Sequence, residues 1–297
     1  MLTGIPSKKN AIIIASLTTI VWSSSWIFIK IGLKEIPALP FAGMRYIMAF
    51  LFFLPWLLKS SSIKAIRRLT RKEWLVMIAL GLLTYPLNQG CLFMAMTYLP
   101  NTTISLITNM APIFLALLGG IFLDEKLNRW QYFGMAITIS GALVFFLPLT
   151  GNNMSVPGWI FSFTTLFANV IGAVLVRKML KAGSIPVLVV TGVPMGIGSI
   201  LMACGASVWE WIPRISLTVW GILLFLSLVN TTIAFTVWNV ALQRLTAFEA
   251  NVISNTMLVQ IALLSWFFLG DAVTWKMAAG MALVIGGVVL INLKGDS

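Results

Sequence analysis

Histidine is absent from the 297 residues, and only two cysteines, Cys91 and Cys204, are present. Without an imidazole the chain lacks the commonest general base and cannot form the H-E-x-x-H zinc site of metalloproteases. Two cysteines in different apolar stretches provide neither a metal cage nor a disulfide framework. The sequence therefore argues against an enzyme, and it predicts no cofactor and no metal site.

Charge is also scarce, since only 9% of the residues are charged while 59% are hydrophobic and the mean hydropathy is +0.98. Soluble domains carry about 25% charged residues, so most of this chain cannot face water. Ten apolar stretches are each close to the ~20 residues that a helix needs to cross a bilayer. They are residues 10–29, 37–58 (interrupted only by Arg45), 74–96, 101–123, 130–149, 157–176, 185–206, 217–240, 250–269 and 277–293. This pattern predicts an all-α polytopic membrane protein with ten transmembrane helices.

The few charges are distributed unequally between the loops. If the N-terminus is cytoplasmic, most of the 20 basic residues fall in cytoplasmic loops, above all in 59–72, and the outer loops keep only Lys30, Lys34, Arg214 and Lys276. This positive-inside bias predicts a protein of the cytoplasmic membrane with both termini in the cytoplasm. The net charge of +12 is then a topology signal, because no basic domain for nucleic acid lies outside the bilayer. The expected partners are the lipid bilayer and a small-molecule substrate, with no nucleic acid and no obligatory protein partner.

The chain contains an internal repeat. Residues 95–141 align without a gap with residues 241–287 at an offset of 146, which pairs Asn109 with Asn255, Gly134 with Gly280 and Gly141 with Gly287. Residues 1–149 and 150–297 then form two repeats, with spans one to five and six to ten. Five is an odd number, so the second repeat enters the membrane inverted relative to the first. Inverted repeats around a central cavity are typical of alternating-access carriers, although a duplication can also merely enlarge a stable bundle.

Four segments resemble a known family. The segment "LPNTTISLITNMAPIFLALLGGIFLDEKLNRWQYFGMAITISGALVFF" at 99–146 is similar to the fourth and fifth spans of EamA-type carriers in the drug/metabolite transporter superfamily, and 245–291 is similar to their ninth and tenth spans. The segments "VWSSSWIFIKIGL" (21–33) and "FAGMRYIMAFLFFLPW" (41–56) extend the resemblance over nearly the whole chain. The resemblance implies a ten-helix basket that exports amino acids, other small metabolites or, in some members, cationic drugs. One departure is Gly270-Asp271, which stands where the first copy has Asp124-Glu125.

Polar and aromatic side chains inside the spans are the candidates for substrate binding, because a polar group in hydrocarbon needs a partner or a wet cavity. They fall on spans one, three, four, six, eight and nine, which we expect to line the pathway, while spans five and ten pack at the periphery. The candidates are Trp22, Ser24, Trp26, Tyr85, Asn88, Gln89, Asn109, Asn169, Asn230, Trp238, Asn239, Asn255 and Gln260. An alternative for the amides, which stays open, is that they only tie neighbouring helices together.

Five further residues are candidates for gating or structural roles. Pro86 and Pro112 each remove a backbone hydrogen bond and can kink or break spans three and four. Glu125 and Asp271 are matched acids of the two repeats and could form symmetric gates, or ion clusters that stabilise turns. Arg45 could bind a substrate carboxylate; a structural role is favoured because its span carries almost no other polar residue.

The acidic residues constrain the coupling of transport. All eight acids fall at span ends or in loops, whereas proton-coupled carriers usually need a titratable group along the route. The sequence therefore predicts facilitative export of small metabolites, with amino acids, including aromatic or other neutral ones, as the favoured substrates. The alternatives are an exporter of drugs or cationic compounds and, in a different class, a lipid-linked flippase or structural membrane subunit.

Overall fold

The computed structural model describes residues 6–99, 104, 107–108, 110–122, 127–146, 155–205, 215–269 and 274–294. This part of the chain is helical and contains no strand. The first half comprises α1 (Lys8–Gly32), α2 (Ala38–Leu57), α3 (Ser60–Arg67), α4 (Arg71–Leu82), the π-helix η1 (Leu83–Gly90), α5 (Cys91–Tyr98), α7 (Ala111–Phe122) and α8 (Arg129–Phe146). The second half comprises α9 (Val156–Ala182), α10 (Val187–Gly205), α11 (Leu217–Phe225), the π-helix η4 (Leu226–Ile233), α12 (Ala234–Ala241), α13 (Ala247–Ser254), α14 (Met257–Leu269) and α15 (Trp275–Lys294).

The predicted membrane character is confirmed. Among the described residues, six helical segments are long and apolar enough to cross a bilayer, and two shorter apolar helices lie at Ala111–Phe122 and Ala278–Ile291. In hydrocarbon every backbone N–H and C=O must be satisfied within the protein, which a helix achieves on its own. The chain is therefore a multi-pass helical membrane protein, and each of the ten predicted apolar stretches contains a helix.

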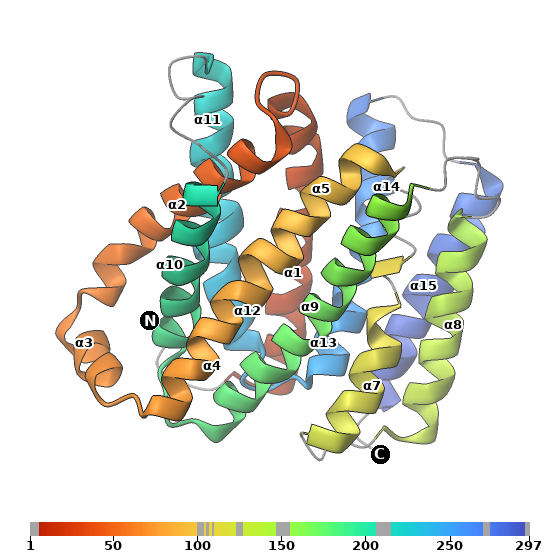
Figure 1. Cartoon of the computed structure of the whole chain (residues 1–297). Helices are drawn as coiled ribbons and strands as arrows, with labels where there is room; N and C mark the ends of the chain where they lie inside the picture. Colours follow the sequence, from red (N-terminus) through yellow and green to blue (C-terminus); the bar gives the residue numbers. More distant parts are fainter. Residues whose placement is uncertain are drawn as a thin grey trace.

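The helices form one bundle with two outer pairs (Figure 1). On one side α2 packs against α10, and on the other α8 packs along α15. Between these pairs, α1 contacts α12, α13 and α14, while α9 contacts η1, α5 and α7, and α7 contacts α13. The helices that bear most of the predicted site residues thus lie between the two outer pairs.

Two of the long helical segments change to π geometry in the middle. η1 lies between α4 and α5, and η4 lies between α11 and α12. In η4 the hydroxyls of Thr231 and Thr232 donate to the carbonyl oxygens of Leu226 and Ser227, five residues earlier, both at 2.9 Å. Pro86 lies inside η1. The helix is therefore not broken at Pro86 and continues through it with π turns. Short π segments within α-helices occur frequently at functional sites.

The ninth span is interrupted. α13 ends at Ser254, Asn255 is its C-cap, and α14 begins at Met257. In the first half α7 begins at Ala111 after a turn at Met110, so Pro112 is the second residue of that helix, where a missing N–H costs little. The interruption places the backbone of Asn255, a predicted site residue, at a helix end inside the bundle.

Candidate functional site

The centre of α1 is bonded to η4 by two reciprocal hydrogen bonds. The indole Nε1 of Trp22 donates to the backbone oxygen of Asn230 at 2.9 Å. In return the side-chain Nδ2 of Asn230 donates to the backbone oxygen of Val21 at 3.0 Å. Because both bonds use polar side chains inside apolar spans, they fix how α1 and η4 are placed against each other.

Gln260 on α14 is a second point of attachment for α1. Its Oε1 accepts from the hydroxyl of Ser23 at 2.7 Å, and its Nε2 donates to Thr19 Oγ1 at 3.0 Å and to Thr256 Oγ1 at 3.1 Å. Asn230 and Gln260 were both predicted from sequence, and the structure brings them to the same helix, α1. Helices from both halves of the chain therefore meet in one polar cluster.

Aromatic rings extend this cluster toward α2. Trp22 lies 4.9 Å from Trp238 and 5.5 Å from Phe235, measured between ring centroids. Phe235 lies 6.4 Å from Tyr85, which in turn lies 5.1 Å from Tyr46 in an edge-to-face arrangement. Such rings can stack on an apolar substrate or face a cationic one.

The remaining predicted residues have other hydrogen-bond partners or none in the described part of the chain. Asn239 donates to Thr191 Oγ1 of α10 at 2.9 Å, and Ser24 donates to the carbonyl of Val21 in its own helix. Asn88, Gln89 and Asn169 are half-buried and have no side-chain hydrogen bond within the described part of the chain; the backbone oxygen of Asn88 accepts from Thr165 of α9. Asn255 is buried. Asn109, Glu125, Asp271 and the side chain of Trp26 lie outside what the structure describes.

One atom of the cluster lacks a partner. Asn230 is 0% exposed, and its Oδ1 is the single fully enclosed side-chain oxygen or nitrogen without a hydrogen bond among the described residues. Leaving a buried acceptor unpaired costs about 1–3 kcal/mol. Native proteins contain few such groups, and each calls for an explanation, such as strain, a functional role, or a bound water or ion.

Arg45 is buried beside the same π-helix. Its Nε donates to Thr231 Oγ1 at 3.1 Å, and its backbone oxygen accepts from Ser227 at 2.9 Å. The guanidinium carbon lies 5.2 Å from the centre of the Tyr46 ring. η4 thus contacts α1 through Asn230 and α2 through Thr231.

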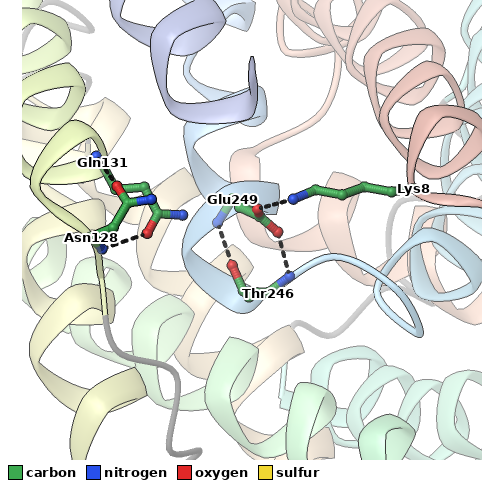
Figure 2. Close-up of polar contacts among 5 residues, drawn as sticks. All are labelled: Lys8, Asn128, Gln131, Thr246 and Glu249. Atoms are coloured by element: carbon green, nitrogen blue, oxygen red, sulfur yellow. Dashed lines mark hydrogen bonds and ion pairs between the residues drawn. The ribbon is translucent and has the colours of Figure 1, made fainter. Parts of the chain in front are cut away.

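An ion pair that the sequence did not predict joins α1 to α13 (Figure 2). Lys8 Nζ lies 3.0 Å from Glu249 Oε1, and the two side chains are 20% and 4% exposed. Glu249 also accepts from the backbone N–H of Thr246, whose hydroxyl accepts from the backbone N–H of Glu249, both at 3.0 Å. The T-x-x-E pattern at 246–249 is the sequence signal for this capping box. Lys8 lies 241 residues away, so no local pattern indicates the ion pair.

A polar cap also begins α8 (Figure 2). The backbone N–H of Asn128 donates to Gln131 Oε1 at 3.0 Å, and the backbone N–H of Gln131 donates to Asn128 Oδ1 at 2.9 Å.

Just after the C-terminal end of α1, Glu35 accepts from the backbone N–H and the hydroxyl of Ser216, the N-cap of α11, at 3.1 and 2.8 Å. α1 is therefore bound to the second half of the chain near both of its ends and at its centre.

We expect the Lys8–Glu249 pair to contribute measurably to stability. Glu249→Gln keeps an acceptor for the N–H of Thr246 and removes the charge, so the free energy of unfolding should fall by about 1 kcal/mol or more, because the pair is largely shielded from water. Thermal unfolding of the purified protein in detergent measures this effect. Glu73→Gln is the matched control, since Glu73 forms the same kind of capping box with Thr70 on an exposed surface. Equal shifts in the two variants would mean that the ion pair adds nothing to the cap.

An apolar groove of about 770 Å³ lies between η1 and α9. Its lining includes Leu83, Leu87, Trp159, Phe163 and Phe167, with Thr164 as the single polar side chain. None of the predicted site residues lines it. The groove is thus separate from the polar cluster between α1, η4 and α14.

Helices that cross a membrane several times around buried amides, hydroxyls and aromatic rings are typical of polytopic membrane proteins with a functional site inside the bundle, the class that includes membrane transporters. Within this class the particular family follows from the sequence. The sequence model of the EamA-like transporter family matches residues 9–147 and again residues 156–293, so the chain belongs to this family. The resemblance to EamA-type carriers is therefore confirmed.

Relatives with related functions cover almost the whole chain. A "Probable amino-acid metabolite efflux pump" of Salmonella typhimurium is 25% identical over 301 residues, which are 97% of this chain and 96% of the relative. A "Probable terminal-alkyne amino-acid exporter" of Streptantibioticus cattleyicolor is 28% identical over 291 residues, which are 94% and 92% of the two chains. One crystal structure matches with a TM-score of 0.81 and 19% identity over 98% of this chain and 100% of that one, so the two share a fold. The protein is accordingly a membrane transporter that exports small molecules.

Proposed function

We propose that this protein exports neutral amino acids, including aromatic ones, across the cytoplasmic membrane by alternating access without an ion gradient. The observation that carries the proposal is the cluster of Trp22, Asn230 and Gln260, where uncharged donors and acceptors and aromatic rings from both halves meet between the helices. Uncharged donors and acceptors beside aromatic rings suit zwitterions better than strongly charged anions. The names of the Salmonella and Streptantibioticus relatives agree with this substrate class.

The proposal includes two inverted five-helix repeats, residues 1–149 and 150–297, with ten spans around a central cavity and both termini in the cytoplasm. The contact between α8 and α15 supports the inversion. A Cβ on Gly141 would meet Gly280 and Val284, whereas one on Gly134, earlier in α8, would meet Gly287 and Ile291, later in α15. The two helices therefore run antiparallel, as Figure 1 shows. Because Gly134 and Gly280 occupy the same position of the repeat, equivalent helices of the two repeats point in opposite directions, which an inversion requires.

The acids support the facilitative part of the proposal. Glu249 is the one buried acid among the described residues, and it lies at the start of α13 in an ion pair with Lys8. No acidic side chain of the described residues lies near the Trp22–Asn230–Gln260 cluster. An exporter of cationic compounds is the second candidate, because the rings of Trp22 and Trp238 could face a cation.

Uptake of labelled amino acids into liposomes that contain the purified protein tests the proposal. We expect saturable uptake of neutral amino acids without an imposed gradient, and no change when a pH difference is added. Uptake that a pH difference drives and that stops when this difference alone is collapsed would contradict the facilitative mechanism. Folded, inserted protein that transports none of the amino acids would contradict the substrate class and favour cationic compounds, which the same liposomes can test.

A further inference from the structure

Arg45 carries a permanent charge well inside a span. It is the eighth residue of α2, about 10 Å from the start of the helix at 1.5 Å per residue, and only 5% of it is exposed. A guanidinium does not lose its proton in a protein, so burial cannot neutralise it. None of the described residues offers Arg45 a carboxylate, and an unpaired buried charge is strongly unfavourable.

The contacts of Arg45 leave its outer edge unused. Thr231 accepts from Nε at 3.1 Å, and the Tyr46 ring lies 5.2 Å from the guanidinium carbon. The four N–H groups on the two terminal nitrogens have no acceptor among the described residues. These nitrogens are also not fully enclosed, because Asn230 Oδ1 is the one fully enclosed side-chain polar atom that lacks a partner there. The structure therefore presents two charged donor groups in one plane that no acceptor of the described residues occupies.

A second buried arginine shows what a purely structural guanidinium does in this fold. Arg177 is 7% exposed, and its Nη1 donates to the backbone oxygens of Leu242 at 2.7 Å and Gln243 at 3.0 Å, just after α12. Arg177 thus satisfies carbonyl groups at the end of a helix. Arg45 is equally buried but directs none of its terminal nitrogens to a carbonyl of the described residues.

We propose that Arg45 binds the carboxylate of the transported substrate. This inference rests on the proposed function and assigns one end of the substrate to a named residue. Thr231 holds Nε, so the two terminal nitrogens remain free to donate in parallel to the two oxygens of a carboxylate, which is the bidentate geometry that arginine favours. Asn230, the neighbour of Thr231 in η4, also has an unpaired acceptor, but this atom is fully enclosed and its side chain faces α1, so it becomes available to an ammonium group only when the contact between α1 and η4 opens. The substrate class is then the α-amino acids with a free carboxylate.

Competition against uptake of labelled phenylalanine in liposomes tests the proposal. The competitors are unlabelled phenylalanine, phenylalaninamide and phenethylamine, which share the ring and the amine and differ at the carboxylate. We expect the wild-type protein to prefer phenylalanine over both analogues by roughly 10- to 100-fold, the range of one charged bidentate contact. Arg45→Gln should remove this preference, and Arg45→Lys, which keeps the charge without the planar fork, should restore part of it.

Binding provides a readout that does not require transport. Quenching of tryptophan fluorescence by 3-phenylpropionate and by 3-phenylpropionamide reports carboxylate recognition in detergent, and we expect only the first compound to bind, in an Arg45-dependent way. Arg177→Gln is the matched control, because it also removes a buried guanidinium. The folded fraction of this variant should keep the preference for the carboxylate. A preference retained in Arg45→Gln, or lost equally in Arg177→Gln, would overturn the proposal.

The two proposals fail in different ways. Wild-type protein that transports phenylalanine and its amide equally would remove the carboxylate subsite and keep the exporter. If the wild-type protein transports no amino acid but binds phenylpropionate through Arg45, the carboxylate subsite stands and amino acids are excluded as the substrates. Absence of carboxylate preference in both assays would overturn the assignment of Arg45.

Discussion

Gly287→Leu is expected to prevent α8 and α15 from packing and to lower the amount of folded protein strongly. A Cβ at this position would meet the hydroxyl of Thr138, the carbonyl oxygen of Gly134 at 2.6 Å and the backbone nitrogen of Thr138 at 2.8 Å. Two of these three atoms belong to the backbone, so a change of side-chain rotamer cannot relieve the clash. The two helices must instead move apart as rigid units. Overpacking costs about 1–3 kcal/mol when side chains can adjust, and more when backbones must shift. Close approach through small residues is what holds membrane helices together.

The neighbouring residue of the same helix is the control. A Cβ on Gly286 would meet no atom within 4 Å, and the residue is exposed. Leucine is the better helix former by up to ~1 kcal/mol, so Gly286→Leu should be neutral or stabilising. Fluorescence-detected gel filtration of fusion proteins, followed by thermal unfolding, compares the two variants. Similar loss of the monodisperse peak in both would contradict the glycine contact.

The sequence predicted the helices better than their contacts. Hydropathy located the apolar stretches because a bilayer imposes a length of ~20 residues and leaves no other way to satisfy the backbone. The repeat also paired Gly134 with Gly280 and Gly141 with Gly287, although it gave no role to these glycines. Their role appears only in the structure, where Gly141 faces Gly280 and Gly134 faces Gly287 across one interface.

The site was predicted as a set of residue types, and its pairings were not. Trp22 and Asn230 are separated by 208 residues, and Ser23 and Gln260 by 237. A polar residue in an apolar span signals a need for a partner, but nothing local says which partner it has. The π-helices were not predicted either. In η4 the hydroxyl of Thr231 accepts from Arg45 of α2, a contact that no local pattern indicates. Whether the predicted residues bind a substrate remains a prediction.

Asn230→Leu should separate stability from transport. The variant removes the unpaired Oδ1, which costs about 1–3 kcal/mol in the wild type, and loses one hydrogen bond from Nδ2 to Val21, which contributes about 1 kcal/mol. The bond from Trp22 is kept because it ends on the backbone of residue 230. The unfolding temperature should therefore stay the same or rise. Uptake of neutral amino acids should fall by about tenfold or more, since a transport state in which the contact between α1 and η4 opens then lacks this acceptor for the substrate.

Thr236→Val is the matched control for this prediction. Thr236 is buried one turn beyond the end of η4, and its hydroxyl donates to the carbonyl of Thr232 at 2.7 Å, so its polar atom already has a partner within its own helix. Valine keeps the shape of this side chain, and we expect uptake to remain close to the wild-type rate. Unfolding temperature and initial uptake rate are measured in the same preparations. Together they show whether the Asn230 amide serves to hold α1 against η4 or to transport the substrate. If Asn230→Leu loses stability and transport together, the amide is a tie between α1 and η4; if stability is kept while transport falls, the unpaired oxygen is retained because the transport cycle uses it.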